Sequence, residues 1–72
     1  MKKYAVVIER GERNLSAYVP DLPGCITTGC SLEEIEKNIR EAIELHLEGM
    51  AEDGEVVPEP STTVQYVEMQ VA

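Results

Sequence analysis

Residues that build metal centres and disulfide frameworks are scarce in this sequence, which has two cysteines and one histidine among 72 residues. Two cysteines form at most one bridge, so a small scaffold held by several disulfides is excluded. Structural zinc needs about four ligands, and Cys25, Cys30 and the distant His46 supply too few. We therefore predict no bound metal, and we expect both thiols to be reduced in a cytoplasmic protein.

Basic residues are also few, because six lysines and arginines stand against 14 aspartates and glutamates, for a formal charge of −8. Nucleic acids and anionic membrane surfaces are bound through clustered Lys and Arg, so we expect neither as a direct partner. A basic protein suits this charge better, since complementary charge speeds encounter. The simpler reading, that excess acid keeps a small protein soluble, stays open.

Long apolar runs are absent as well, and nothing approaches the ~20 residues that span a bilayer. Lys2-Lys3 precedes an alternating pattern, not the apolar core of a signal peptide. The length allows one domain, residues 1–72. Such a domain buries only about 60% of its unfolded surface. Self-association as a dimer or tetramer is the supplement we expect.

Three short segments have the composition of β-strands: residues 4–9, 15–19 and 25–28. A charged loop flanked by Gly11 and Asn14 separates the first two segments and suits a hairpin. Before the third segment, Pro23-Gly24 fits the two central positions of a type II turn, where glycine supplies the positive φ. The pattern predicts an antiparallel meander.

One long helix is predicted to begin at the N-cap Ser31 and to end near residue 52 or 53, with Gly54 as the left-handed stop. Glu34 stands three residues after Ser31, which is the spacing of a capping box. An apolar stripe at helical spacing comprises Leu32, Ile35, Ile39, Ala42, Ile43, Leu47 and Met50. We expect Ile39→Asp to unfold the domain and Glu41→Gln, on the solvated side, to be tolerated.

A fourth strand is predicted at residues 64–71, after an extended segment that contains Pro58 and Pro60. The order β-β-β-α-β is an α+β fold with one helix packed on one face of the sheet. Because the helix reverses the chain, the last strand should run parallel to the first.

The second face of this sheet should stay uncovered, since one helix covers only one side. Ala5 and Val7 face that side, and Tyr18, Val64 and Tyr66 extend it. An exposed apolar face usually marks an interaction site. We expect this face, or an open edge of the sheet, to be buried by a second copy or by a partner.

The most specific stretch runs from Asp21 to Glu34, where a Pro-Gly turn, a short strand, a second glycine and a capped helix follow one another. With the hairpin before it and Pro-x-Pro-Ser after it, this order resembles the HicB antitoxin domain over roughly residues 4–71. The matching residues are Tyr18, Asp21, Leu22, Pro23, Gly24, Cys25, Gly29, Ser31, Glu34, Asn38, Ala42, Pro58, Pro60 and Ser61. The sequence differs from the family in two ways. Cys30 stands where the family usually has an acidic or polar residue, and the sequence lacks the DNA-binding segment that many members carry after this domain.

The resemblance implies a trimmed ribonuclease-H-like sheet in which the last strand lies beside the first, in the order 3-2-1-4. It also implies an antitoxin that occludes a HicA-like toxin, a small basic ribonuclease with a double-stranded-RNA-binding-like fold and a catalytic histidine. Acidic side chains would then replace RNA phosphates. The candidates are Glu9, Glu12 and Asp21 in loops, and Glu33, Glu36, Glu41 and Glu44 on the helix. The alternative is a stand-alone oligomeric structural or regulatory domain with no toxin partner.

An enzymatic role is not expected, because the residues with catalytic potential have simpler explanations. His46 lies in the apolar stripe, and no partner is placed by sequence to complete a triad. Cys25 suits a small buried hydrophobe. Cys30, beside the helix N-terminus, is either a reactive thiol or an ordinary one, and we favour the ordinary one. Asp21 suits an Asx-type turn before Pro23. Since phosphate loops and nucleophile elbows are also missing, we predict no catalytic residues and no cofactor. We expect no specific DNA binding, because the sequence lacks the DNA-binding segment that the resemblance leads us to look for.

Overall fold

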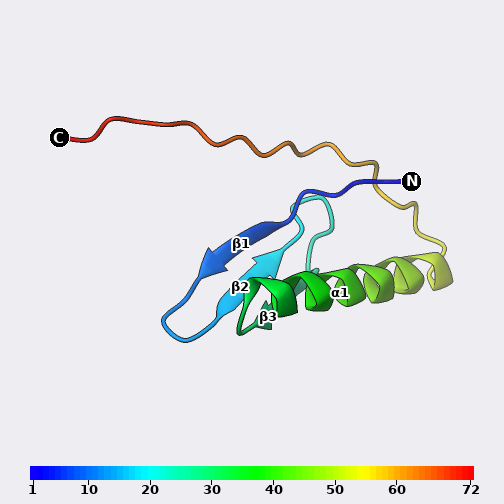
Figure 1. Ribbon diagram of the computed structural model, residues 1–72. Helices are drawn as coiled ribbons and strands as arrows, with labels where there is room; N and C mark the ends of the chain where they lie inside the picture. Colours follow the sequence, from blue (N-terminus) through cyan, green and yellow to red (C-terminus); the bar gives the residue numbers. More distant parts are fainter.

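The computed structural model describes residues 1–72 and contains three strands and one helix (Figure 1). They follow in the order β1 (Val7–Arg10), β2 (Leu15–Tyr18), β3 (Ile26–Gly29) and α1 (Leu32–Glu52). The strands form one antiparallel sheet in the order β1-β2-β3, and α1 packs across one face, over β3 and β2. The predicted α+β fold with an antiparallel meander and one covering helix is confirmed to this extent.

Two turns of the predicted kind set the register of the sheet. The loop between β1 and β2 is closed by the Gly11 N–H, which donates to the Asn14 carbonyl at 2.8 Å. The turn before β3 is closed by the Cys25 N–H, which donates to the Leu22 carbonyl at 3.0 Å. Gly24 has a φ of 86°, the left-handed value that a type II turn requires at its third residue. This turn therefore has the chemistry that the sequence predicted.

Both ends of α1 are capped by local hydrogen bonds. The Ser31 hydroxyl accepts from the Glu34 N–H at 3.1 Å, and the Glu34 carboxylate accepts from the Cys30 N–H, one residue earlier than in a standard capping box. At the other end, Gly54 has a φ of 69° and the Glu55 N–H donates to the Met50 carbonyl at 2.9 Å. This Schellman motif confirms the predicted end of the helix.

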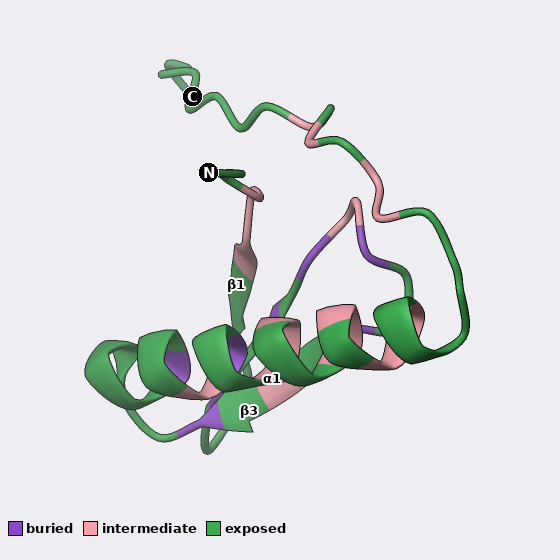
Figure 2. Cartoon of the chain, turned by 90° about the vertical axis from the view of Figure 1, so that its right-hand side faces the viewer, coloured by how far each residue is buried: buried purple, intermediate pink, exposed green.

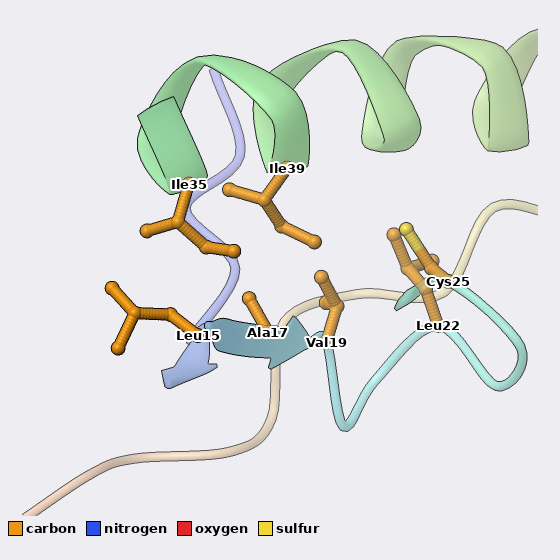
Figure 3. Packing of buried hydrophobic residues seen from close by; sticks show 7 residues of the cluster. All are labelled: Leu15, Ala17, Val19, Leu22, Cys25, Ile35 and Ile39. Carbon is orange, nitrogen blue, oxygen red and sulfur yellow. The ribbon is translucent and has the colours of Figure 1, made fainter. Parts of the chain in front are cut away.

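The core is small and lies between β2, the turn before β3 and the first half of α1. Its buried side chains are Leu15, Ala17 and Val19 from β2 and its end, Leu22 and Cys25 from the turn, and Ile35 and Ile39 from α1 (Figure 3). Gly29 lets the helix approach β3, since a Cβ there would lie 3.0 Å from the Ile35 backbone nitrogen. The Asn38 amide donates to the Thr28 carbonyl at 2.9 Å and fastens α1 to β3.

The fourth strand is not formed within the chain, which corrects the prediction for residues 64–71. Residues 55–72 contain no helix or strand, so neither the parallel last strand nor the sheet order 3-2-1-4 is present. A strand needs a paired neighbour to satisfy its backbone groups. In Figure 1 this segment, orange to red, passes above β1 in the same general direction without joining the sheet.

Candidate partner-binding site

The face of the sheet that lies opposite α1 is bare. Val7 lies opposite Tyr18, and Tyr18 lies opposite Ile26, so these three side chains point to the same side. Their neighbours Leu15 and Ala17 alternate to the other side and are buried under α1. Tyr18 is 39% exposed and Ile26 is 69% exposed. The predicted uncovered face is therefore present around Val7 and Tyr18, but the predicted Val64 and Tyr66 lie outside the sheet.

This surface, called the outer sheet face below, comprises Val7, Glu9, Ser16, Tyr18, Ile26 and Thr28. A shallow, mostly apolar hollow crosses it between β2 and β3, lined in part by Tyr18 and Ile26. Ile26 belongs to this face, although the sequence analysis did not predict it there. Strand alternation supplies the missing signal, because a buried Cys25 places the next side chain on the opposite side.

The predicted partner-binding acids separate into two groups. Glu9 belongs to β1, not to a loop as predicted, and it shares the outer sheet face with its neighbour Ser16; Glu12 is exposed in the hairpin loop beside it. The second group is exposed on α1 and comprises Glu33, Glu36, Glu41 and Glu44, of which Glu36 also lines a groove between α1 and the segment before β1. Since α1 covers the inner face, the two groups point in opposite directions, and one compact partner does not contact both face-on.

Asp21 has a structural partner inside the chain. Its two carboxylate oxygens accept four hydrogen bonds, two from the N–H and hydroxyl of Ser61 and two from the N–H and hydroxyl of Thr62, at 2.8–3.1 Å. The backbone N–H groups of Ser61 and Thr62 are the main reason that the pKa of Asp21 falls from 3.8 to about 2. Its side-chain hydrogen bonds hold residues 61–62 to the loop after β2, in place of the predicted Asx-type turn.

The cysteines and the histidine do not gather. Cys25 is buried in the core, and burial raises the pKa of its thiol. Cys30 is exposed just before the helix, and His46 is half-buried on α1. No three side chains among histidine, cysteine, aspartate and glutamate lie close enough together to hold a metal ion. The helix is also not apolar enough to cross a membrane. The outer sheet face is thus the most developed candidate site.

Residues 4–71 match the family described as the HicB_like antitoxin of bacterial toxin-antitoxin system, which is nearly the whole chain. This chain belongs to the HicB-like antitoxin family. The structure is also similar to a chain of a solved "HicA3 and HicB3 toxin-antitoxin complex", with a TM-score of 0.72 and 30% sequence identity. That similarity covers 83% of this chain and 70% of the other. The resemblance drawn from the turn and helix motifs is therefore confirmed.

Curated relatives of this HicB-like chain occur in a virus and in an archaeon. A UPF0150 protein of Archaeoglobus fulgidus is 47% identical over 58 residues, which is 76% of this chain and 84% of the relative. An uncharacterized 14.9 kDa protein in the rep-hol intergenic region of Haemophilus phage HP1 is 41% identical over 64 residues. The match covers 89% of this chain but only 48% of the phage protein, so the chain spans about half the length of that relative.

Proposed function

We propose that this HicB-like chain is an antitoxin that binds a small basic HicA-like ribonuclease and occludes its RNA-binding and catalytic surface. It acts by binding, not by turning over a substrate. The observation that carries the proposal is the outer sheet face, which is apolar at its centre, has the Glu9 carboxylate at one end and is uncovered by α1. The similarity to a chain of a toxin-antitoxin complex supports the class of partner.

The outer sheet face has the anatomy of a protein interface. Tyr18 and Ile26 provide an aromatic and an aliphatic anchor at its centre. Glu9 and Glu12 lie at the hairpin end, where the rim of an interface is usually polar. A basic toxin would meet apolar contact in the middle and these two carboxylates at the edge, beside two exposed arginines of the same hairpin. The acids on the far side of α1 then steer the encounter from a distance without entering the contact.

Co-expression tests the proposal. A toxin encoded beside this chain should arrest growth when expressed alone, and growth should recover when this chain is expressed with it. Ile26→Lys should abolish this rescue, because it places a positive charge in the centre of a contact with a basic partner. Circular dichroism should show that the variant remains folded, since Ile26 is 69% exposed.

The chain offers a matched control in Leu45, which is 68% exposed on α1, outside the outer sheet face. Leu45→Lys makes the same chemical change at the same exposure and should leave rescue intact. A toxin that remains lethal with abundant wild-type chain would contradict the antitoxin proposal. Rescue by both variants alike would contradict the assignment to the outer sheet face.

A second candidate function is a stand-alone oligomeric binding domain without a toxin. It is favoured by the large apolar surface left exposed near the C-terminus, where Tyr66 is 95% exposed and Val71 is 85% exposed. Such a surface is suited to self-association. The absence of a small basic reading frame next to the gene would favour this alternative.

A further inference from the structure

The sheet ends at β1, and the edge of β1 that faces away from β2 has no neighbouring strand. The sheet order leaves its outer edge unpaired, with free backbone N–H and C=O groups. Helix α1 lies over β3 and β2, and its backbone does not approach β1. Ile8 lies opposite the buried Ala17 and therefore faces the helix side, yet it is 43% exposed. The sheet lacks one strand at this edge.

A groove accompanies the open edge on the helix side. It lies between α1 and the segment that leads into β1. Its apolar lining is Tyr4, Val6, Ile39 and Ile43, and the charged side chains of Lys2, Glu36 and Arg40 complete it. The apolar side chains pack at the margin of the core, and all except Ile39 are only partly buried. A strand added beside β1 would direct every second side chain into this groove. We call the groove and the edge together the β1 edge groove.

The chain also contains an unpaired segment with the pattern of a strand, residues 63–72, called the C-terminal arm below. All ten residues are exposed and extended away from the helix and the sheet (Figure 2). Val67, Met69 and Val71 fall on one side of the extended backbone, and Val64 and Tyr66 fall on the other. An edge strand with apolar groups on both faces, as β1 has, suits an arm of this kind.

The root of the arm is held firmly to its own domain. The Tyr4 hydroxyl donates to the Pro58 carbonyl at 2.6 Å, Lys2 pairs with Glu59, and Asp21 holds Ser61 and Thr62. From this anchor the arm leaves the sheet, so the β1 edge groove of the same chain remains open (Figure 1). The arm of the same chain thus does not fill the groove in this structure, and the arm of a second copy is the occupant that we consider.

The exposed area points to a second copy. A compact folded monomer of 8.0 kDa is expected to expose about 4,500 Å², whereas this chain exposes 6097 Å². The excess is about 1,600 Å², and a stable protein interface buries about 800 Å² on each partner. The radius of gyration, 14.2 Å, likewise exceeds the about 11 Å of a compact chain of this length.

We infer that two copies exchange their C-terminal arms, each arm adding as an extra strand to the β1 edge groove of the other copy. Val67, Met69 and Val71 enter the groove against Val6 and Ile43. Val64 and Tyr66 extend the opposite face. The exchange is reciprocal, so it closes a two-fold dimer and leaves no open arm. The centre of the outer sheet face, between β2 and β3, stays free.

Sedimentation velocity on the full chain is the first test, and it should give twice the 8.0 kDa of one chain. Val67→Asp puts a charge on the groove side and should weaken the dimer about tenfold or more in dissociation constant. Gln70→Asp adds the same charge to the other side of the arm and serves as the matched control, with a change of about twofold or less. Circular dichroism checks that both variants keep the fold.

A mixture of isotope-labelled and unlabelled chains decides which copy supplies the arm. Intermolecular NOEs should join the Met69 methyl group of one copy to Tyr4 and Val6 of the other. A chain that stays monomeric at millimolar concentration would overturn the inference. So would contacts made only within one chain, which would mean that the arm folds back on its own β1, or equal weakening of the dimer by both variants. No toxin takes part in these measurements, so their outcome is independent of the antitoxin proposal.

Discussion

At the scale of single residues, one carboxylate connects segments that are 40 positions apart in the chain. Asp21 follows β2, and its acceptors meet Ser61 and Thr62 at the root of the C-terminal arm. Asp21 was proposed from the sequence as a contact for a partner, but its carboxylate oxygens accept hydrogen bonds from residues of the same chain. Core positions such as Ile39 show the more familiar case, in which a side chain stabilises the fold through burial alone.

The attachment of the arm root should depend on pH. Because the pKa of Asp21 is lowered from 3.8 to about 2 in the folded chain, the stabilisation is complete above about pH 4 and is lost as pH falls through about 2. In an NMR titration the Asp21 carboxyl carbon and the Ser61 and Thr62 amides should shift together with that midpoint. Asp21→Asn should remove the transition and speed hydrogen exchange at both amides. An Asp21 midpoint near 3.8 would contradict this account.

Ile39→Asp should unfold the chain. Ile39 is 5% exposed in the seam between α1 and the sheet. Truncating such a side chain to Ala costs about 2–5 kcal/mol, and a buried carboxylate without a partner costs more. Circular dichroism and urea denaturation measure the effect. Glu41→Gln, on the exposed side of α1, should change the free energy of unfolding by about 0.5 kcal/mol or less. A cooperative transition in Ile39→Asp close to that of the wild type would contradict the placement of the core.

At the scale of secondary-structure elements, β3 and the first turns of α1 approach each other closely. It depends on Gly29, where an added Cβ would lie 3.0 Å from the Ile35 nitrogen and 3.2 Å from its Cα. These are backbone atoms, which cannot move without shifting the helix. The Asn38 side chain fastens the same pair of elements through the Thr28 carbonyl.

Two glycine substitutions should therefore have opposite effects. Gly29→Ala should destabilise the chain by about 1–3 kcal/mol, because the helix must move off β3. Gly49→Ala should stabilise it by about 0.5–1 kcal/mol, because Gly49 lies inside α1 and a Cβ there meets nothing within 4 Å. Chemical denaturation of both variants gives the comparison. If both shifted stability in the same direction, the close contact of α1 with β3 would be wrong.

At the scale of the whole molecule, charge and shape both point to association. The chain carries a formal charge of −8, and most of its acids lie on exposed surface. The N-terminus lies near the arm root, where Lys2 pairs with Glu59, whereas the C-terminus lies at the far end of the extended residues 63–72, and the longest axis of the molecule is 51 Å (Figure 1). A monomer of this shape leaves apolar surface in water that association would cover.

Binding to a basic toxin should weaken with salt. Long-range attraction between a chain of charge −8 and a basic partner is screened when the Debye length falls from about 10 Å at 0.1 M to about 3 Å at 1 M salt. The association rate constant should therefore fall about tenfold or more over this range, while the dissociation rate constant changes less. Stopped-flow measurement separates the two. An association rate that does not change with salt would leave the acidic surface without a role in encounter.

The amino-acid sequence by itself determined the local features and the family. The Pro23-Gly24 turn, the Ser31 cap and the Gly54 stop are set by neighbouring residues through backbone preference and short hydrogen bonds. For the same reason the helix, the three-strand meander and the bare outer face were predictable from spacing and alternation.

The position of residues 61–72 relative to the sheet was decided only by the tertiary structure. Alternation of Val67, Met69 and Val71 predicts a strand but does not name the neighbour that pairs with it. Which strand the arm can reach depends on where its root is attached. The root is attached by the hydrogen bonds from Ser61 and Thr62 to Asp21, and these positions are too far apart in the sequence for a local pattern to connect them. The separation of the acids into two opposed groups likewise follows from which face of the sheet α1 covers, since a sheet has two faces and local preference does not distinguish them.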